Sequence, residues 1–207
     1  MSRRRVVVTG LGAISPIGNT VPEAWENLLA GKSGIGPITR FDASAFSSRI
    51  AGEVKNFDVT EYLSAKEARR MDVFIHYGMA AGIQAIRDSG IEVNDSNADR
   101  IGVNIGSGIG GLPMIEETHD DYLGGGKISP FFIPGTIINM ISGNLSIMFG
   151  MRGPNIAVVT ACTTGLHAIG MSARMIEYGD ADVMVCGGAE STVTHLAIGG
   201  FASAKAL

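Results

Sequence analysis

Apolar positions along the chain form short hydrophobic runs that alternate with longer segments of helical periodicity. The runs predict buried strands at residues 5–9, 101–105, 155–160 and 181–186. The helical patterns predict helices at residues 20–31, 64–90, 134–149 and 163–178. Strands that alternate with helices are typical of an α/β fold with a mainly parallel sheet covered by helices on both faces.

Capping residues support the limits of several of these helices. Thr20 is the expected N-cap of the first helix, because a proline follows in its first turn. Ser64 and Glu67 have the spacing of a capping box, which predicts one long helix that begins there and ends at Gly90. Gly179 is expected to end the last helix in the same way.

The composition indicates a globular protein and makes several functional classes improbable. A chain of 207 residues with 45% hydrophobic and 17% charged positions can bury a sizeable core. Its net charge of −4, with lysine and arginine thinly spread, does not predict a nucleic-acid surface. No apolar stretch has membrane-spanning length. The two cysteines form neither a disulfide framework nor a zinc motif, which favours a reducing, cytoplasmic location and predicts no metal.

The glycine-rich segment at residues 106–111 resembles a nucleotide-binding fingerprint. It has the G-x-G-x-x-G pattern and follows a predicted strand. However, no second strand carries a ribose-binding acid about 20 residues further on. The pattern alone is therefore weak evidence for a nucleotide site.

Cys162 stands where a predicted strand changes into a predicted helix. Free amide groups and the helix dipole at such a position favour a thiolate. The small neighbouring residues, Ala161 and Thr163, leave room for a substrate carbonyl to reach the sulfur. Position alone leaves two interpretations open, a nucleophile or a buried and inert cysteine. Cys186, inside an apolar run, is expected to belong to the core.

Five segments together resemble the β-ketoacyl-(acyl-carrier-protein) synthases, the condensing enzymes of fatty-acid elongation. They match in order and spacing at residues 6–12, 106–111, 129–134, 160–165 and 187–190. The chain, residues 1–207, resembles the N-terminal half of these enzymes, and within the family it is most similar to the elongating type represented by synthase II. The resemblance implies a thiolase-like α/β fold and a homodimer formed through a strand next to the nucleophile.

The resemblance also implies roles for individual residues. Cys162 would hold the acyl group as a thioester, and its backbone N–H would help to stabilise the oxyanion. The acyl-binding pocket would include Ile109, Phe132 and Phe201. No metal or organic cofactor is implied.

Part of the family's catalytic machinery has no counterpart in this sequence. The two histidines and the lysine that assist decarboxylation lie in the C-terminal half of the family's enzymes. The chain's own histidines do not fall in matching motifs; they are His76, His119, His167 and His195. His167 is expected to pack on its own helix. The chain is therefore predicted to lack part of the active site.

An acidic acyl carrier protein is the partner that the resemblance implies. Lys66, Arg69 and Arg70 stand at i, i+3 and i+4 of a predicted helix, which places them on one face. Lys127 and Lys205 are further docking candidates. The alternative for all five is an ordinary solvated basic surface.

The predicted function is an acyltransferase reaction, the decarboxylative condensation of malonyl carrier protein with an acyl group held on Cys162. Two alternatives remain. A catalytically silent partner that sets chain length would share most of the fold but typically lacks the nucleophile. A thiolase would use the same kind of cysteine on coenzyme A thioesters, without malonyl decarboxylation.

Overall fold

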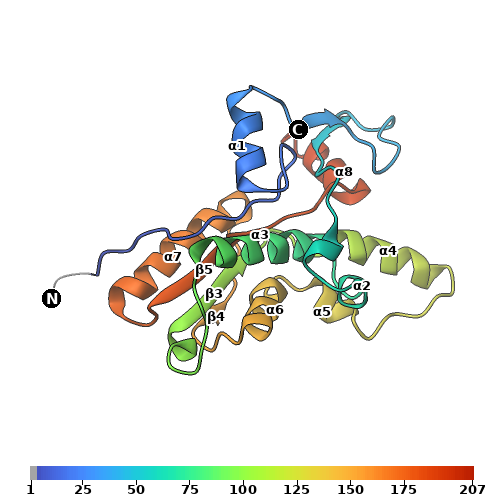
Figure 1. Cartoon of the computed structure of the whole chain (residues 1–207). Coiled ribbons are helices and arrows are strands. Elements are labelled where there is room, and N and C mark those ends of the chain that lie inside the picture. Colours follow the sequence, from blue (N-terminus) through green and yellow to red (C-terminus); the bar gives the residue numbers. More distant parts are fainter. Residues whose placement is uncertain (1–3) are drawn as a thin grey trace.

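The computed structural model describes residues 4–207, and its centre is a three-stranded parallel sheet with helices on both faces (Figure 1). The middle strand, β3 (Ile101–Gly106), pairs with β4 (Asn155–Ile156) on one side and β5 (Val183–Gly188) on the other. All six residues of β3 are buried. The parallel pairing confirms the predicted α/β class.

Alternation along β3 divides the core into two layers. Ile101, Val103 and Ile105 pack in one hydrophobic cluster with α3 (Val73–Ser89) and α6 (Met140–Phe149). On the opposite face the side-chain amide of Asn104 donates to the backbone oxygen of Ala168 in α7 (Thr164–Tyr178), at 3.1 Å. The sheet therefore separates α3 and α6 from α7.

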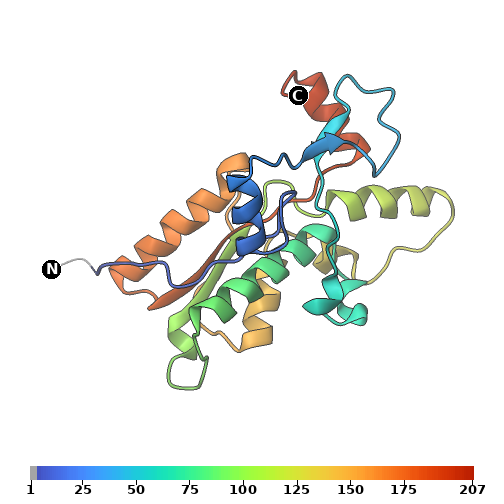
Figure 2. The ribbon, with the colours of Figure 1, turned by 45° about the horizontal axis from the view of Figure 1, so that its top comes forward.

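The remaining elements surround this core. The β1–β2 hairpin is antiparallel, and α8 lies beside it, apart from the parallel sheet (Figures 1 and 2). These elements are α1 (Val21–Leu29), β1 (Ile35–Pro37), β2 (Ile50–Gly52), η1 (Val59–Glu61), α2 (Ala65–Ala68), η2 (Ala98–Arg100), α4 (Leu112–Leu123), α5 (Phe132–Thr136), η3 (Ala161–Thr163) and α8 (His195–Ser203). Among the described helices, none combines the length and apolarity needed to cross a membrane.

The predicted caps are confirmed. The side chain of Thr20 accepts a hydrogen bond from the backbone of α1. Ser64 and Glu67 form the complete capping box at the start of α2. Gly90 and Gly179 end α3 and α7 with φ angles of 66° and 87°, in the left-handed region that glycine adopts easily.

The single helix predicted at residues 64–90 was wrong, because the chain breaks between α2 and α3. Asp72 causes the break by acting as a second N-cap. One carboxylate oxygen accepts from the backbone N–H of Phe74 at the start of α3, and the other accepts from that of Met114 in α4. Burial raises the pKa of this carboxyl. Asp72 thus joins the starts of two helices.

Two other boundaries also differ from the predictions. The helix predicted at residues 134–149 is divided into α5 and α6, because Ile137 is extended at ψ 141°. Only two residues of the strand predicted at 155–160 pair with β3. The rest of that segment continues as an irregular chain toward Cys162.

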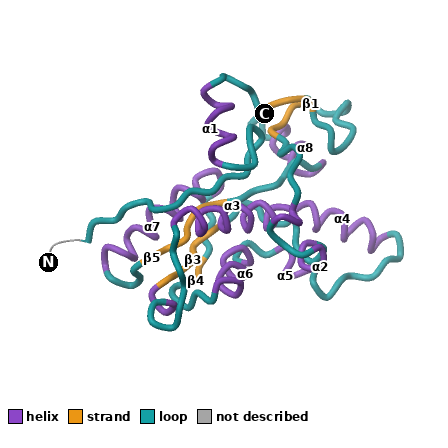
Figure 3. The backbone as a smooth tube through the Cα atoms, viewed as in Figure 1, coloured by secondary structure: helices purple, strands orange, loops and turns teal. Residues whose placement is uncertain are grey.

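The predicted N-terminal strand at residues 5–9 pairs with no other strand of the described chain, and Figure 3 draws it as loop. Val7 and Val8 are 60% and 76% exposed. The chain then passes directly over α3 at Gly12, where a Cβ atom would overlap the carbonyl oxygen of Ala81. Glycine is needed at this point because backbone lies against backbone.

Candidate active site

Cys162 lies on a tight turn immediately before α7. It belongs to η3, and its side chain is exposed. The preceding residue, Ala161, has a φ of 52°, which is left-handed and strained for a residue with a side chain. Thr164 stabilises the turn by accepting a hydrogen bond from the backbone N–H of Thr160 at 2.9 Å. The cysteine is therefore presented outward at the N-terminal end of a 15-residue helix.

A cavity of about 570 Å³ opens in front of Cys162. Its walls come from segments that follow the carboxyl ends of all three parallel strands, which is where ligands bind in open α/β sheets. The lining consists of residues 106–109 at the end of β3 and beyond it, Ala161, Cys162, Thr164 and Gly165 after β4, residues 188–190 and Thr192 at the end of β5 and beyond it, and Phe201 of α8.

The cavity brings together three of the four residues assigned to the acyl site. Ile109 and Phe201 line it with Cys162, and they are 43% and 41% exposed. Phe132 lies in α5 and is not part of the lining. The structure therefore supports a shared site for Ile109, Phe201 and Cys162, and it gives no support for Phe132.

Two polar residues of the site escaped the sequence interpretation. Glu190 accepts hydrogen bonds from the Ser107 hydroxyl at 3.0 Å and from the backbone N–H of Ile109 at 2.9 Å. Ser107 is a buried residue of the glycine-rich turn itself. The sequence did contain a signal for Glu190, which is the last residue of the matched segment 187–190. Only the fold shows that its side chain is hydrogen-bonded to the turn after β3.

Cys186 occupies a different environment from Cys162. It lies within β5 and is partly buried. Burial raises the pKa of its thiol, although a hydrogen bond with Ser172 of α7 opposes this effect. Cys186 fits the predicted core position, and both thiols are free.

The histidines lie away from the cavity lining. His167 is exposed, and its Nδ1 lies 2.7 Å from the hydroxyl of Thr160, so the prediction that it packs on its helix was wrong. His76 contacts the backbone oxygen of Ala68, and His195 stacks on Phe41 with ring centroids 4.2 Å apart. Within residues 4–207, no group of three or more His, Cys, Asp or Glu side chains could hold a metal ion.

The basic residues proposed for docking do not share one continuous helix. Lys66 lies in α2, Arg69 is its C-cap, and Arg70 follows the helix end. The Arg70 guanidinium stacks on the Phe131 ring at 4.1 Å, which leaves Lys66 and Arg69 as the freely exposed pair. The break at Asp72 explains this difference.

The two other docking candidates lie on separate segments. Lys127 is exposed between α4 and α5, and Lys205 is exposed just after α8. Figures 1 and 2 show α8 apart from α2. Any carrier-protein surface around α2 would therefore not include all five residues in one small patch.

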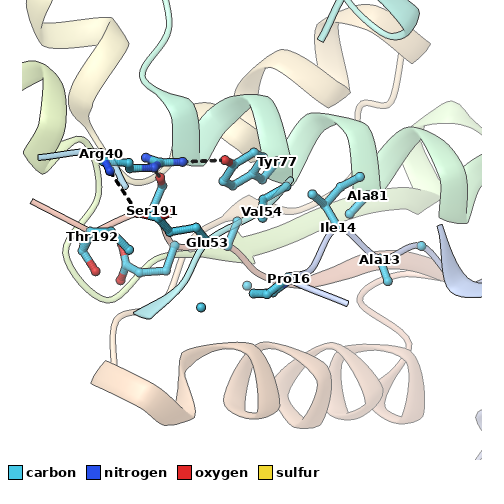
Figure 4. A pocket seen from close by; sticks show the side chains of 16 residues that line it. Ala13, Ile14, Pro16, Arg40, Glu53, Val54, Tyr77, Ala81, Ser191 and Thr192 are labelled. Atoms are coloured by element: carbon cyan, nitrogen blue, oxygen red, sulfur yellow. Dashed lines mark hydrogen bonds between the residues drawn. The ribbon is translucent and has the colours of Figure 1, made fainter. Parts of the chain in front are cut away.

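A second cavity of about 520 Å³ is also lined by residues 188–190 and Thr192, together with Arg40, Glu53 and Tyr77 (Figure 4). Arg40 donates to the Tyr77 hydroxyl at 2.9 Å and to the Ser191 hydroxyl at 3.4 Å. Burial alone would raise the pKa of Glu53, but hydrogen bonds from Thr39 and Arg40 outweigh it and keep that pKa below its usual value. Arg40 and Glu53 thus have hydrogen-bond partners, and the lining holds no thiol.

Comparison with known families agrees with this geometry. The family described as "Beta-ketoacyl synthase, N-terminal domain" matches residues 3–207. The chain belongs to this family. A 3-oxoacyl-(acyl-carrier-protein) synthase 2 from Vibrio cholerae serotype O1 is 64% identical to this chain over 209 residues, covering 100% of the chain and 50% of the relative. The chain thus spans about half the length of the curated relatives it matches.

Solved structures confirm the thiolase-like fold of this chain. The ishigamide ketosynthase/chain length factor superposes with a TM-score of 0.85 at 31% identity, covering 100% of the synthase chain and 52% of that protein. A second neighbour is described as a type II PKS acyl-carrier protein in complex with its ketosynthase bound to the hexaketide. It gives a TM-score of 0.78 at 26% identity, covering 97% and 55%.

Proposed function

We propose that this synthase chain supplies the nucleophilic half of an enzyme that elongates fatty acids by decarboxylative condensation. The observation that carries the proposal is the position of Cys162, exposed on a strained turn at the head of α7 and lining a cavity of about 570 Å³. Relatives of the same family that cover the whole chain are named 3-oxoacyl-(acyl-carrier-protein) synthase 2.

The chemistry begins with transfer of the acyl group to the cysteine. The Cys162 thiolate attacks the carbonyl carbon of an acyl carrier-protein thioester, a new C–S bond forms, and the carrier's thiol leaves with a proton. The backbone N–H of Cys162 lies where α7 begins, and N–H groups there have no partner within the helix. Such a group can donate to the developing oxyanion.

Condensation then releases the cysteine. The malonyl group on a second carrier protein loses carbon dioxide, and its carbanion attacks the acyl carbonyl carbon. The bond to the Cys162 sulfur breaks, and the thiol regains a proton. The histidines and lysine that the family uses for decarboxylation are not supplied by the matching segments of this chain, so the chain's own contribution is to hold and position the acyl group.

An acyl carrier protein is the proposed partner. A solved neighbour at 26% identity is a ketosynthase described in complex with its acyl-carrier protein. Lys66 and Arg69 are exposed beside each other on α2 and offer positive charge to an acidic partner. Lys127 and Lys205 are also exposed, but they lie on separate segments and are kept only as further docking candidates.

We infer a homodimer through the segment that leads to the nucleophile. Residues 157–160 continue from β4 without a strand partner among the described residues. Val159 is 52% exposed, and Leu166 on the adjoining helix is 72% exposed. An apolar edge of this kind is favoured for pairing with a second chain.

The two free cysteines support a reducing, cytoplasmic location.

The alternatives are less well supported. A silent chain-length partner has no use for an exposed cysteine on a strained turn at a cavity. A thiolase is disfavoured because curated relatives that cover the chain are synthases named for carrier-protein substrates.

The test is to find where the acyl group is held. Full-length protein is incubated with acyl carrier protein and analysed by intact mass, with Cys186→Ala as the matched control for Cys162→Ala. We expect the wild type and Cys186→Ala to gain the mass of the acyl group and Cys162→Ala to gain none. An adduct of the same mass on Cys162→Ala would contradict the proposal.

A further inference from the structure

We propose that Glu190 is a positioning residue that selects acyl-chain length by holding Ile109 in place across the cavity. The inference rests on the proposed function, because it concerns the acyl group held on Cys162. It adds a residue from the end of β5 to a site otherwise described by the cysteine and the residues that surround the acyl chain. The pair of hydrogen bonds that Glu190 accepts from residues 106–111 is called here the Glu190 tie.

The Glu190 tie uses both oxygens of one carboxylate. Oε1 accepts from the Ser107 hydroxyl at 3.0 Å, and Oε2 accepts from the backbone N–H of Ile109 at 2.9 Å. The same Ser107 hydroxyl accepts from the backbone N–H of Gly110 at 3.0 Å. Glu190 thus holds the turn directly at Ser107 and Ile109, and the Ser107 hydroxyl in turn holds Gly110. Hydrogen bonds to a charged acceptor are stronger than those between neutral groups.

The approach is close enough to require glycine. A Cβ atom on Gly108 would lie 2.8 Å from Oε2 of Glu190. The backbone reinforces the contact, since the N–H of Ala189 donates to the carbonyl oxygen of Gly106 at 3.0 Å. The segment after β5 is thus in direct contact with the end of β3 and the turn that follows it. Glu190 lies next to this contact and lines the cavity.

The far end of the turn is fixed separately. The backbone N–H of Gly111 donates to the carbonyl oxygen of Thr136 at 3.0 Å, and a Cβ on Gly111 would lie 2.7 Å from the Thr136 Cα. In the middle of the turn, Glu190 accepts from the backbone N–H of Ile109, and the Ser107 hydroxyl, itself bonded to Glu190, accepts from that of Gly110. Ile109 is also the only large side chain in residues 106–111, so a shift of the turn would chiefly move Ile109.

The charge of Glu190 has no other partner in the described structure. Across residues 4–207, every ion pair involves other acidic residues: Asp182, Asp120, Asp95 and Asp99. Because this carboxylate forms no ion pair among the described residues, its side-chain hydrogen bonds are those with the turn. This is the arrangement expected of a positioning group rather than of a surface ion pair.

Loss of the tie should therefore change selection and leave the nucleophile intact. With Glu190→Ala the turn can move aside, and Ile109 obstructs a long acyl chain less than before. We expect the ratio of long-chain to short-chain acyl-enzyme formation rates to rise about fivefold or more, as the loss of hydrogen bonds to a charged acceptor implies. Glu190→Gln keeps one acceptor oxygen and should give a smaller rise.

The experiment measures acyl-enzyme formation by intact mass in the full-length protein, with carrier proteins bearing short and long acyl groups. Asp58→Ala is the matched control, because that exposed carboxylate also accepts from one backbone N–H and one hydroxyl, both of Thr60, at 2.8 and 2.6 Å. It lies outside the cavity lining and should leave the ratio unchanged. Gly108→Ala, which would push the carboxylate away, should raise the ratio as Glu190→Ala does.

The decisive comparison uses the Ile109→Ala background. If Glu190 acts through Ile109, adding Glu190→Ala to Ile109→Ala produces no further change in the ratio. An equal change in rate at all chain lengths, or a change in ratio that persists without the Ile109 side chain, would overturn the proposal. Failure of the proposed function looks different, since the wild type would then form no adduct on Cys162 at any length.

Discussion

The two faces of the parallel sheet are packed very differently. On one face, α3 buries nine of its residues, and Phe74 and Ile75 are 0% exposed. On the other, α7 buries only Thr164, Ala168 and Ser172. Its large apolar side chains point elsewhere, with Leu166 72% exposed. The first face is a completed core, whereas the second is held to the sheet through small and polar residues.

This difference accounts for the position of the proposed nucleophile. Small residues let α7 approach the sheet closely, as shown by Gly188, where a Cβ would lie 3.0 Å from the Gly165 backbone. The start of α7, with Cys162, is thereby placed next to the ends of β3 and β5. The completed core on the other face provides the rigid support that a positioned nucleophile needs. The exposed side of α7 remains available for a second chain.

The largest expected effect tests the comparison directly. Phe74→Ala removes a fully buried ring and should lower the free energy of unfolding by about 3–5 kcal/mol. Leu166→Ala on α7 should change it by less than about 0.5 kcal/mol if its side chain stays in solvent. Denaturant unfolding of both variants measures the difference. A cost for Leu166→Ala as large as that for Phe74→Ala would show that the α7 face is covered in solution.

The reactivity of the two cysteines tests the same difference between the two faces, with a smaller expected effect. Cys162 is exposed at the open end of α7, whereas burial raises the pKa of the Cys186 thiol. Because only the thiolate is nucleophilic, Cys162 should react with iodoacetamide at least about tenfold faster near neutral pH. Peptide mapping of briefly treated, folded protein gives the two rates. Equal modification would remove the case for an accessible nucleophile at Cys162, and denatured protein supplies the control in which both should react alike.

Local signals in the sequence predicted much of the fold. Caps such as Ser64 and Gly179 act through neighbouring backbone groups, so they are visible in a short window of residues. Continuous apolar runs located β3 and β5 for the same reason. The β1–β2 hairpin, α4 and α8 were not predicted, since their short apolar patterns are weak.

The missed features depend on contacts between distant segments. Asp72 interrupts the helix after Ser64 because it also caps α4, some forty residues later in the chain. Residues 5–9 have the pattern of a strand, but a strand needs a partner, and none pairs with them in the described chain. Glu190 could be matched to a family segment, yet its hydrogen bonds to Ser107 and Ile109 cross 83 and 81 residues. Sequence periodicity carries no information about such contacts between distant segments.

The smallest expected effect comes from charge reversal at α2, which tests whether a carrier protein docks there, beside the completed core. Lys66→Glu combined with Arg69→Glu reverses two exposed charges at the α2 end of the molecule. Reaction with acyl carrier protein should slow by about 3- to 10-fold at low salt, because charges at an interface rim chiefly change the association rate. Small acyl thioesters without a carrier should react as before, since they have no acidic surface to attract.

Lys55→Glu combined with Arg87→Glu is the matched control, because it reverses two exposed positive charges elsewhere on the chain. Stopped-flow or quenched acylation rates at several salt concentrations separate docking from net charge. The difference between wild type and the α2 variant should vanish near 1 M salt, where the screening length falls to about 3 Å. If the control variant slows the carrier substrate equally, or if the α2 variant also slows small thioesters, α2 is not the docking site.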